Sequence, residues 1–206
     1  MSEFTARYLA EIRKIAELID VRAVEKVVDL IVELRQSSGR LFFLGVGGGA
    51  AHASHAVNDF RKLAGVECYA PTDNVSELTA RTNDDGWDTT FAHWLETSRL
   101  SSRDMVFVIS VGGGDLERNI SPNLVKALEH ARSVGSKIVG IVGREGGFTA
   151  RVADACILIP VVNPSAVTPY TESFQAVMWH LLVSHPALKM KAATWESKAG
   201  DPSGRR

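Results

Sequence analysis

The stretch RLFFLGVGGGAAHASHAVND, residues 40–59, decides the fold of this chain. Its first half is a short apolar run that leads into a cluster of glycines, which predicts a buried strand followed by a tight turn. Its second half opens a predicted helix over residues 50–63. The segment DMVFVISVGGG, residues 104–114, repeats the pattern of an apolar run that ends in glycines. Two strands that are apolar along their whole length indicate a parallel sheet covered on both faces.

The rest of the chain continues this alternation of strands and helices. Further apolar runs predict strands at residues 67–70, 137–143 and 155–160. Apolar residues at helical spacing predict helices at residues 4–19, 22–36, 76–81, 87–97, 122–134 and 169–185. Because strands that alternate with helices form parallel sheets between helical layers, the sequence predicts an α/β fold. We expect one domain over residues 1–190, with two leading helices in residues 1–38, and a polar tail over residues 191–206.

The composition is that of an ordinary globular protein. The 206 residues carry a net charge of −1, and 45% of them are hydrophobic and 23% charged, which suggests neither a nucleic-acid nor a membrane surface. No apolar run approaches the roughly 18 residues that a membrane span requires, and the N-terminus lacks a hydrophobic signal segment. We therefore expect a cytoplasmic protein. Cys68 and Cys156 have no paired spacing and are expected to be small buried residues.

The first glycine loop lies where a strand gives way to a helix. Glycine lets a ligand approach the backbone closely, and the first N–H groups of a helix attract anions. Gly47, Gly48 and Gly49 are therefore candidate contacts for a phosphate or a sugar. A dinucleotide site would need the spacing G-x-G-x-x-G and an acidic residue after the second strand, and the sequence has neither. A purely structural tight turn remains the alternative.

The second glycine loop, residues 110–121, leads into another predicted helix. Serine hydroxyls and N–H groups beside a helix N-terminus bind phosphate, so Ser110, Gly112 and Ser121 are candidate contacts for an anion. Ser121 also has the position of a helix N-cap, with Pro122 after it, and capping is compatible with ligand contact. Carboxylates within the loop oppose the binding of an anion, and one arginine offsets them.

Two pairs of ionisable residues lie on helices that are far apart in the sequence. His55 and Asp59 are four residues apart, and Glu172 and His180 are eight apart, so each pair shares one helix face. The face around His180 is otherwise apolar, which predicts a buried pair that needs a neutralising partner. Two imidazoles and two carboxylates suit a divalent ion, and the nitrogen ligands favour zinc. A histidine in the core or at an interface is the simpler alternative for either imidazole alone.

Three segments match the sequence patterns of one known family. Residues 45–59 read GVGGGAAHASHAVND, similar to G-N-G-G-S-A-A-x-A-x-H-x-x-x-E, with His55 and Asp59 at the His and Glu positions. Residues 72–86 read TDNVSELTARTNDDG, similar to T-D-T-S-x-L-T-A-x-x-N-D-x-G. Residues 168–180 read TPYTESFQAVMWH, similar to T-P-R-I-Q-E-x-H-x-x-x-x-H. The chain therefore resembles the phosphoheptose isomerases of the SIS (sugar isomerase) class, from its leading helices to about residue 185.

The resemblance implies roles for the matching residues. In the family, the Glu position, here Asp59, and the last histidine, here His180, act as base and acid with zinc bound between them. Glu172 stands at the family's glutamine position. The metal ligands that the resemblance implies are His55, Asp59, Glu172 and His180. The substrate contacts that it implies in the matched segments are Ser76, Asn83, Asp84 and Thr168.

The resemblance also implies a fold, an assembly and a reaction. The family fold is a three-layer sandwich with a five-stranded parallel sheet between helices, and its members are usually homotetramers with active sites at subunit interfaces. They interconvert sedoheptulose 7-phosphate and glycero-manno-heptose 7-phosphate, an aldose–ketose change through an enediol. The alternative is a non-catalytic SIS module that binds sugar phosphate or another protein, as in a tetrameric partner of a replication initiator that resembles the same family.

The chain departs from the family pattern at several positions. Val46 and Gly49 replace an asparagine and a serine in the first loop, and Asp59 is one methylene shorter than glutamate. Glu172 introduces a carboxylate in place of an amide. The second loop lacks the family pattern S-T-S-G-N-S and is about six residues longer. We interpret these changes as a partial exchange of duties between Asp59 and Glu172, with Glu172 as base or ligand.

Overall fold

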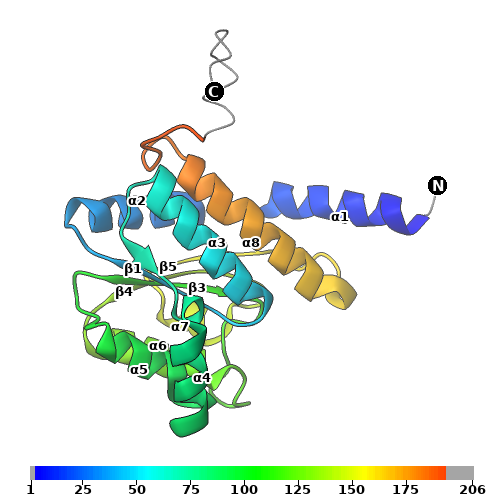
Figure 1. Cartoon of the computed structure of the whole chain (residues 1–206). Coiled ribbons are helices and arrows are strands. Elements are labelled where there is room, and N and C mark those ends of the chain that lie inside the picture. The colour runs from blue at the N-terminus through cyan, green and yellow to red at the C-terminus, as the bar shows by residue number, and fades with distance from the viewer. Residues whose placement is uncertain (1–2, 194–206) are drawn as a thin grey trace, which may run out of the picture.

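A parallel β-sheet forms the centre of the molecule (Figure 1). The computed structural model describes residues 3–193, so the predicted polar tail lies outside the described residues from 194 onward. Over the described residues the sheet has five strands in the order β2-β1-β3-β4-β5, and every neighbouring pair is parallel. The strands are β1 Leu41–Gly45, β2 Cys68–Tyr69, β3 Met105–Ser110, β4 Lys137–Val142 and β5 Ala155–Leu158. The predicted α/β fold with a five-stranded parallel sheet is confirmed.

Helices cover both faces of the sheet and complete a three-layer sandwich. The α-helices are α1 Glu3–Leu18, α2 Val21–Gln36, α3 Gly48–Leu63, α4 Val75–Asp84, α5 Thr90–Thr97, α6 Pro122–Ser133, α7 Gly147–Val152 and α8 Val167–Ser184. Residues of α2, α3 and α8 form one hydrophobic core with the sheet, and residues of α5, α6 and α7 form the other. Figure 1 shows these two groups on opposite sides of the sheet.

Side chains along the central strands point alternately into the two hydrophobic cores. Phe43 and Phe107 point to the core that contains α3 and α8, while Phe42 and Val106 point to the core that contains α5 and α6. Successive side chains of a strand face opposite sides of the sheet, so an unbroken apolar run is what a sheet covered on both faces requires. The sequence pattern of residues 41–44 therefore has its physical cause in the two helical layers.

The order of the strands places the glycine loops at one edge of the sheet. From β1 the chain moves outward to β2, then returns to β3 on the other side of β1. Ligands of open parallel sheets bind outside the carboxyl ends of the strands at such a reversal. The two glycine loops follow β1 and β3, so they flank this point. α8 crosses back from β5 and packs beside α3, on the same face.

Two helical segments differ from the prediction. The helix predicted over residues 87–97 is divided into a 3-10 turn, Trp87–Thr89, and α5. α7 was not predicted, because its six residues are too few to show a helical period. Its first N–H groups are held by the second glycine loop, since the carbonyl oxygens of Gly113 and Gly114 accept hydrogen bonds from Thr149 and Phe148. Within residues 3–193, no helix combines the length and the apolar character that a membrane crossing requires.

α1 is poorly covered by the rest of the protomer. Its side chains are mostly exposed, including Phe4 at 61% and Leu9 at 62%, and Figure 1 shows the helix projecting from the body. One attachment is made by Tyr170 of α8, whose hydroxyl donates a hydrogen bond to Glu11 and whose ring lies 4.7 Å from that of Tyr8. α1 therefore presents apolar side chains that the described residues do not cover.

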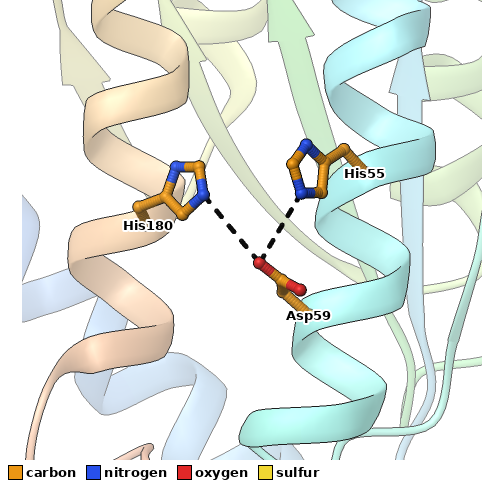
Figure 2. Close-up of side chains that lie close together, drawn as sticks. All are labelled: His55, Asp59 and His180. Atoms are coloured by element: carbon orange, nitrogen blue, oxygen red, sulfur yellow. Dashed lines mark ion pairs between the residues drawn. The ribbon is translucent and has the colours of Figure 1, made fainter. Parts of the chain in front are cut away.

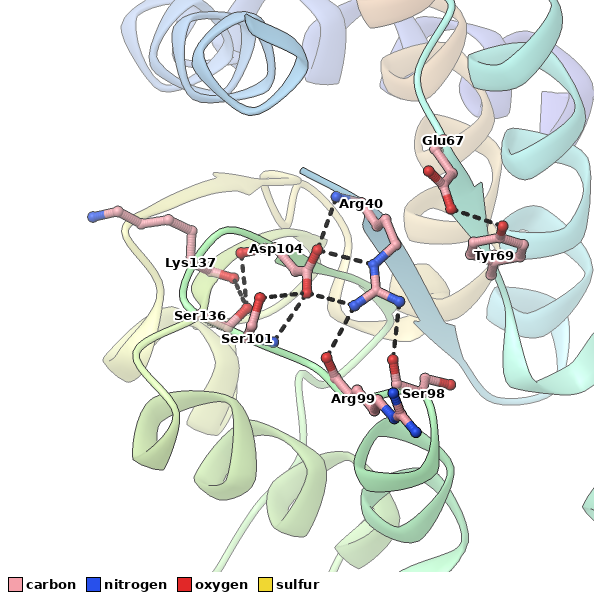
Figure 3. A network of polar contacts seen from close by, with 9 residues as sticks. All are labelled: Arg40, Glu67, Tyr69, Ser98, Arg99, Ser101, Asp104, Ser136 and Lys137. Atoms are coloured by element: carbon pink, nitrogen blue, oxygen red, sulfur yellow. Dashed lines mark hydrogen bonds and ion pairs between the residues drawn. The ribbon is translucent and has the colours of Figure 1, made fainter. Parts of the chain in front are cut away.

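An ion pair between a partly exposed arginine and a buried aspartate joins the amino ends of β1 and β3, opposite the glycine loops (Figure 3). Asp104 is 3% exposed, and Arg40 donates to both of its carboxylate oxygens, through Nε at 3.1 Å and Nη2 at 2.8 Å. The backbone N–H and hydroxyl of Ser101 also donate to Asp104. Burial acts to raise the pKa of Asp104, but the hydrogen bonds from Arg40 and Ser101 outweigh it and hold the pKa below its ordinary value.

Because the pKa of Asp104 is lowered on folding, its contribution to stability is present above its unfolded pKa of about 3.9 and is lost as the pH falls through the folded value. We expect Asp104→Asn to reduce the free energy of unfolding at pH 7 by about 2 to 3 kcal/mol, since it removes one partner of a buried pair. Urea unfolding from pH 7 to pH 3 tests this. The wild-type advantage should shrink toward the acid end, whereas Asp154→Asn, which breaks the more exposed pair with Lys137, should change little. A wild-type advantage that is constant with pH would contradict the assignment.

Candidate active site

His55, Asp59 and His180 meet on the outer side of α3 and α8 (Figure 2). His55 and Asp59 lie one helical turn apart on α3, and His180 faces them from α8. The Nε2 atoms of His55 and His180 lie 3.8 and 3.9 Å from Oδ2 of Asp59. One ligand atom from each residue lies within 4.8 Å of the other two. The structure thus brings together three of the four predicted metal ligands, from segments far apart in the sequence.

Hydrogen bonds from outside the cluster fix the atoms that face its centre. Nδ1 of His180 lies 2.7 Å from the carbonyl oxygen of Ala176. Since a carbonyl oxygen only accepts, Nδ1 carries a proton, and in the neutral imidazole Nε2 then presents a lone pair. The side-chain amide of Asn58 donates to Oδ1 of Asp59 at 2.7 Å, which leaves Oδ2 to face the two imidazoles. A lone pair and a free carboxylate oxygen therefore point at one spot.

The three atoms form a donor set that fits a divalent metal. Separations of 3.8 and 3.9 Å are too long for hydrogen bonds. Two ligands of a tetrahedral zinc ion, each about 2.0 to 2.2 Å from the metal, lie roughly 3.3 Å apart, so small side-chain rotations would bring these atoms into range. Two imidazoles and one carboxylate are also the ligands of zinc sites that keep a position open for substrate.

Small side chains on α3 allow the two helices to meet closely. Ala53 and Ala56 are fully buried in the core that α3 shares with α8, and helices approach more closely where the contact residues are small. Trp179 of α8 fills the same core and is fully buried. His180, the next residue, is thereby directed to the outer side of the seam.

The cluster lies at the surface of the protomer, which corrects one prediction. The side chains of His55 and His180 are 58% and 50% exposed, while that of Asp59 is 15% exposed. Val177 and Leu181, the apolar neighbours of His180, are also exposed. The prediction that His180 lies on a buried stripe is wrong for the protomer, because an apolar helix face does not reveal whether the same chain covers it.

Glu172 lies beside the first glycine loop and outside the group of three. A Cβ atom at Gly48 would lie 2.6 Å from Oε1 of Glu172, so the glycine leaves the space that the carboxylate occupies. The N-terminus of a helix favours a negative charge, and Gly48 is the first residue of α3. His52 is one turn further along α3, where burial lowers its pKa against the opposing effect of the nearby Glu172 charge.

The other glycines of the first loop fit tightly against the sheet. Gly47 has a φ of +59°, in the region that favours glycine, and it turns the chain from β1 into α3. A Cβ atom at Gly49 would overlap the carbonyl oxygen of Ile109 at the end of β3. These glycines therefore serve a tight turn, and they also leave the backbone open beside Glu172.

A cavity of about 640 Å³ opens at the carboxyl ends of β3, β4 and β5. Its lining includes Gly112, Asp115, Arg118, Arg144, Glu145 and Val167. Ser110, at the start of the same loop, accepts a hydrogen bond from the N–H of Gly113. Val167 begins α8 and His180 lies thirteen residues later, about 20 Å along the helix axis at 1.5 Å per residue. The cavity and the cluster therefore lie toward opposite ends of α8, with Glu172 between them.

The N-terminus of α6 lacks the predicted cap. Ser121 has the N-cap position, but its φ is +50° and its side chain makes no capping hydrogen bond within residues 3–193. Pro122 follows at the first helical position, as predicted. Nδ2 of Asn123 is buried and has no hydrogen-bond partner among the described residues. Thr168, in the first turn of α8, is exposed.

Ser76, Asn83 and Asp84 are not brought to the cluster within one protomer. All three are exposed on α4, which packs through Leu78 on the sheet face opposite α3 and α8. Asn83 donates its side-chain hydrogen bond to the adjacent Asp84. These three predicted contacts therefore remain separate from the cluster in the protomer.

Comparison of the sequence with known proteins shows which family the chain belongs to. The SIS domain family model matches residues 7–143. A phosphoheptose isomerase from Aneurinibacillus thermoaerophilus is 32% identical over 167 residues, which cover 79% of each chain. The chain belongs to the phosphoheptose isomerase family of SIS domain proteins. The resemblance seen in the three sequence segments is thereby confirmed.

Solved structures agree with this SIS fold. A phosphoheptose isomerase from Neisseria gonorrhoeae superimposes with a TM-score of 0.75 at 24% identity, covering 88% of this chain and 96% of the other. One from Francisella tularensis gives a TM-score of 0.76 at 19% identity, covering 89% and 97%. At these identities the likeness supports the fold, and the site residues of this SIS protein are argued from its own geometry.

Sequence reasoning missed two residues that shape the cluster of this SIS protein. Asn58 orients Asp59, and Trp179 lies under both imidazoles, with its ring centroid 4.6 Å from that of His55 and 3.4 Å from that of His180. Asn58 is adjacent to a predicted ligand and could have been suspected on that ground. Trp179 gives no such signal, because it lies within the apolar run that buries α8.

Proposed function

We propose that this chain is an aldose–ketose isomerase that acts in the cytoplasm on a sugar phosphate, converting sedoheptulose 7-phosphate to glycero-manno-heptose 7-phosphate. The proposal is carried by the meeting of His55, Asp59 and His180 in a chain with a SIS fold. The sequence of this chain is 32% identical to that of a phosphoheptose isomerase. Such a reaction moves a proton between neighbouring carbons through an enediol, so it needs an acid and a base side by side.

Asp59 and His180 have the properties of this pair. Oδ2 of Asp59 faces the centre of the cluster and can take the proton from the substrate carbon, while Asn58 holds the other oxygen. Nε2 of His180 lies 3.9 Å from Oδ2 of Asp59, and it can take up and return the proton of the neighbouring substrate hydroxyl. The hydrogen bond from Nδ1 to the carbonyl of Ala176 keeps the imidazole in the tautomer that this role needs.

The same cluster is proposed to hold zinc. His55, Asp59 and His180 would be its ligands, and Glu172 would be a fourth ligand or the alternative base. Because the lone pair on Nε2 of His180 cannot bind zinc and accept a proton at once, His180 would transfer the proton only while it is not coordinated, and Glu172 would be the base while it is. When bound, such an ion polarises a carbonyl and stabilises the negative oxygen of an enediolate. The support is the donor set, which consists of two imidazole nitrogens and a carboxylate oxygen. Outer hydrogen bonds already orient two of the three residues, Asp59 and His180.

The glycine loops are proposed to bind the remainder of the substrate. Gly47, Gly48 and Gly49 leave the backbone open next to Glu172, and a sugar lying along the seam of α3 and α8 would reach them. For the phosphate we propose Ser110, Gly112, Ser121 and Thr168. Because Thr168 lies about 18 Å along α8 from His180 within one protomer, we propose that a neighbouring copy brings these phosphate contacts to the cluster. The N-terminus of α6 adds N–H groups, and Nδ2 of Asn123, which has no hydrogen-bond partner among the described residues, lies there as well.

We also propose a homotetramer with sites at subunit interfaces. The exposed cluster, the exposed Val177 and Leu181 beside it, and the uncovered apolar residues of α1 all favour further copies that cover them. Ser76, Asn83 and Asp84 lie on the far layer of the protomer, so a neighbouring subunit is the route by which they would reach a site.

The proposal is tested by incubating the purified protein with sedoheptulose 7-phosphate in deuterium oxide and measuring both product and deuterium at the exchanging carbon. We expect turnover, deuterium incorporation and bound zinc. Bound zinc with exchange supports the isomerase. Absence of zinc, exchange and product would instead favour the non-catalytic SIS module, which the loss of polar groups at Val46 and Gly49 also permits.

Glu172→Gln separates the roles of the two carboxylates. If Glu172 shares proton transfer or metal binding with the shorter Asp59, the variant should lose about a hundredfold in kcat, the lower range for a catalytic acid or base. Glu129→Gln, an exposed change on α6, is the matched control and should leave kcat unchanged. Near-normal turnover of Glu172→Gln would end the hypothesis that Glu172 is a base or a ligand.

A further inference from the structure

The indole of Trp179 contacts both imidazoles of the cluster. Its ring centroid lies 3.4 Å from that of His180 with the planes 28° apart, and 4.6 Å from that of His55 with the planes 59° apart. The two imidazoles lie 5.5 Å from each other, nearly perpendicular. The three rings therefore form a triangle in which each contacts the other two, and the Nε2 atoms of the two imidazoles face Oδ2 of Asp59.

Trp179 is an unfavourable choice if its task is only to fill the core. It is fully buried, and its Nε1 has no hydrogen-bond partner within the described part of the chain. A buried N–H group without an acceptor destabilises the folded state, and buried tryptophans usually find a partner. A phenylalanine would fill much of the same space without this cost. The size of the indole, which reaches both imidazoles at once, is a property that a smaller ring lacks.

We propose that Trp179 is a positioning residue for the metal site, which holds the rings of His55 and His180 in the orientation that presents both Nε2 atoms to one ion. This inference rests on the metal site of the proposed function. The fully buried indole is held by the core, and each imidazole lies against it. Coordination withdraws electrons from an imidazole, and the electron-rich face of an indole stabilises a ring that has become more positive. Trp179 should therefore favour the metal-bound state over the metal-free state.

Zinc affinity of metal-free protein, measured by competition with a chelator, tests the proposal without reference to activity. Loss of a group that orients metal ligands typically weakens affinity by about 10- to 100-fold, and we expect that loss for Trp179→Leu. Trp179→Phe keeps an aromatic face and should lie between Trp179→Leu and wild type. Removal of the unpaired N–H offsets part of the cost of the smaller ring in the core, so Trp179→Phe should stay folded while binding zinc less tightly.

Fluorescence provides a second readout that does not depend on Trp179→Leu being folded. Zinc binding in the wild type should change the emission of Trp179, since both contacting rings become ligands. The change should be absent from Trp179→Phe. The cobalt(II) absorption spectrum of Trp179→Phe should also shift, because these bands report ligand geometry.

Trp94 supplies the matched control. It is a partly buried tryptophan in the opposite helical layer, where its ring packs edge-on against Phe42 at 5.6 Å. Trp94→Phe should retain the affinity for zinc and the zinc-dependent fluorescence change. The proposal is overturned if Trp179→Leu is folded and binds zinc within about twofold of wild type, or if the fluorescence change persists in Trp179→Phe. A wild-type protein that binds no divalent metal would refute the metal site of the proposed function. That result is distinct from a wild-type protein that binds zinc with no contribution from Trp179, which would refute only the role of Trp179.

Discussion

Replacement of His180 with alanine is expected to lower the kcat/KM of isomerisation about a thousandfold. The variant removes one member of the acid–base pair, and such groups contribute about 10²- to 10⁴-fold. It also removes one of the three proposed ligands, so zinc affinity should fall together with activity. The unfolding temperature should change little, since the side chain is 50% exposed. Assays with sedoheptulose 7-phosphate and metal analysis of the same sample measure both effects.

His93→Ala is the matched control for this variant. His93 is a partly exposed histidine that also faces an aspartate, with Nδ1 3.2 Å from Oδ2 of Asp85, but it lies on α5 in the other helical layer. It should retain wild-type activity and metal content. Wild-type activity in His180→Ala would remove the proton shuttle proposed for the cluster.

Gly113→Ala is expected to reduce the free energy of unfolding by about 3 to 5 kcal/mol. Gly113 has a φ of +71°, and a Cβ atom there would overlap the carbonyl oxygen of Gly146. A left-handed conformation costs a residue with a side chain about 1 to 2 kcal/mol, and forcing atoms into a packed site adds about 1 to 3 kcal/mol. The same displacement would break the hydrogen bonds that Thr149 donates to the Gly113 carbonyl. Thermal unfolding should show a fall of roughly 10 °C.

The neighbouring glycine is the control for this effect. Gly112 has an ordinary φ, and a Cβ atom there would meet no described atom within 4 Å. Gly112→Ala should therefore leave the unfolding temperature within about 2 °C of wild type. Equal stability of the two variants would show that the second glycine loop is not packed as described.

The sequence predicted the sheet well because its signal is local. Residues 41–44 and 105–109 are apolar at every position, and only a strand with helices on both faces needs this. α7 was not predicted because hydrogen bonds from a distant part of the chain stabilise it. Its N–H groups are satisfied by the carbonyls of Gly113 and Gly114, more than thirty residues earlier, and a local period cannot report a long-range hydrogen bond.

The candidate site was predictable in part. Spacing placed His55 with Asp59 on one helix face, but joining them to His180 required the family resemblance, since nothing in the spacing brings α3 to α8. The exposure of His180 could not be predicted, because an apolar helix face in the sequence does not show whether the same chain or another copy covers it. The role of Trp179 could not be predicted from the sequence, because a tryptophan in an apolar helix is usually a core residue. Only the structure shows that it contacts the two imidazoles.

The return of α8 to the side of α3 has a consequence for the order of biosynthesis. His55 and Asp59 emerge from the ribosome early and His180 late, so a nascent chain has no cluster until its last helix is translated. Until then the faces of α3 and the sheet that receive α8 stay uncovered, and such intermediates are prone to aggregate. A stop codon before residue 167 would therefore yield a chain that has the strands and both glycine loops but lacks His180 and the cluster it completes.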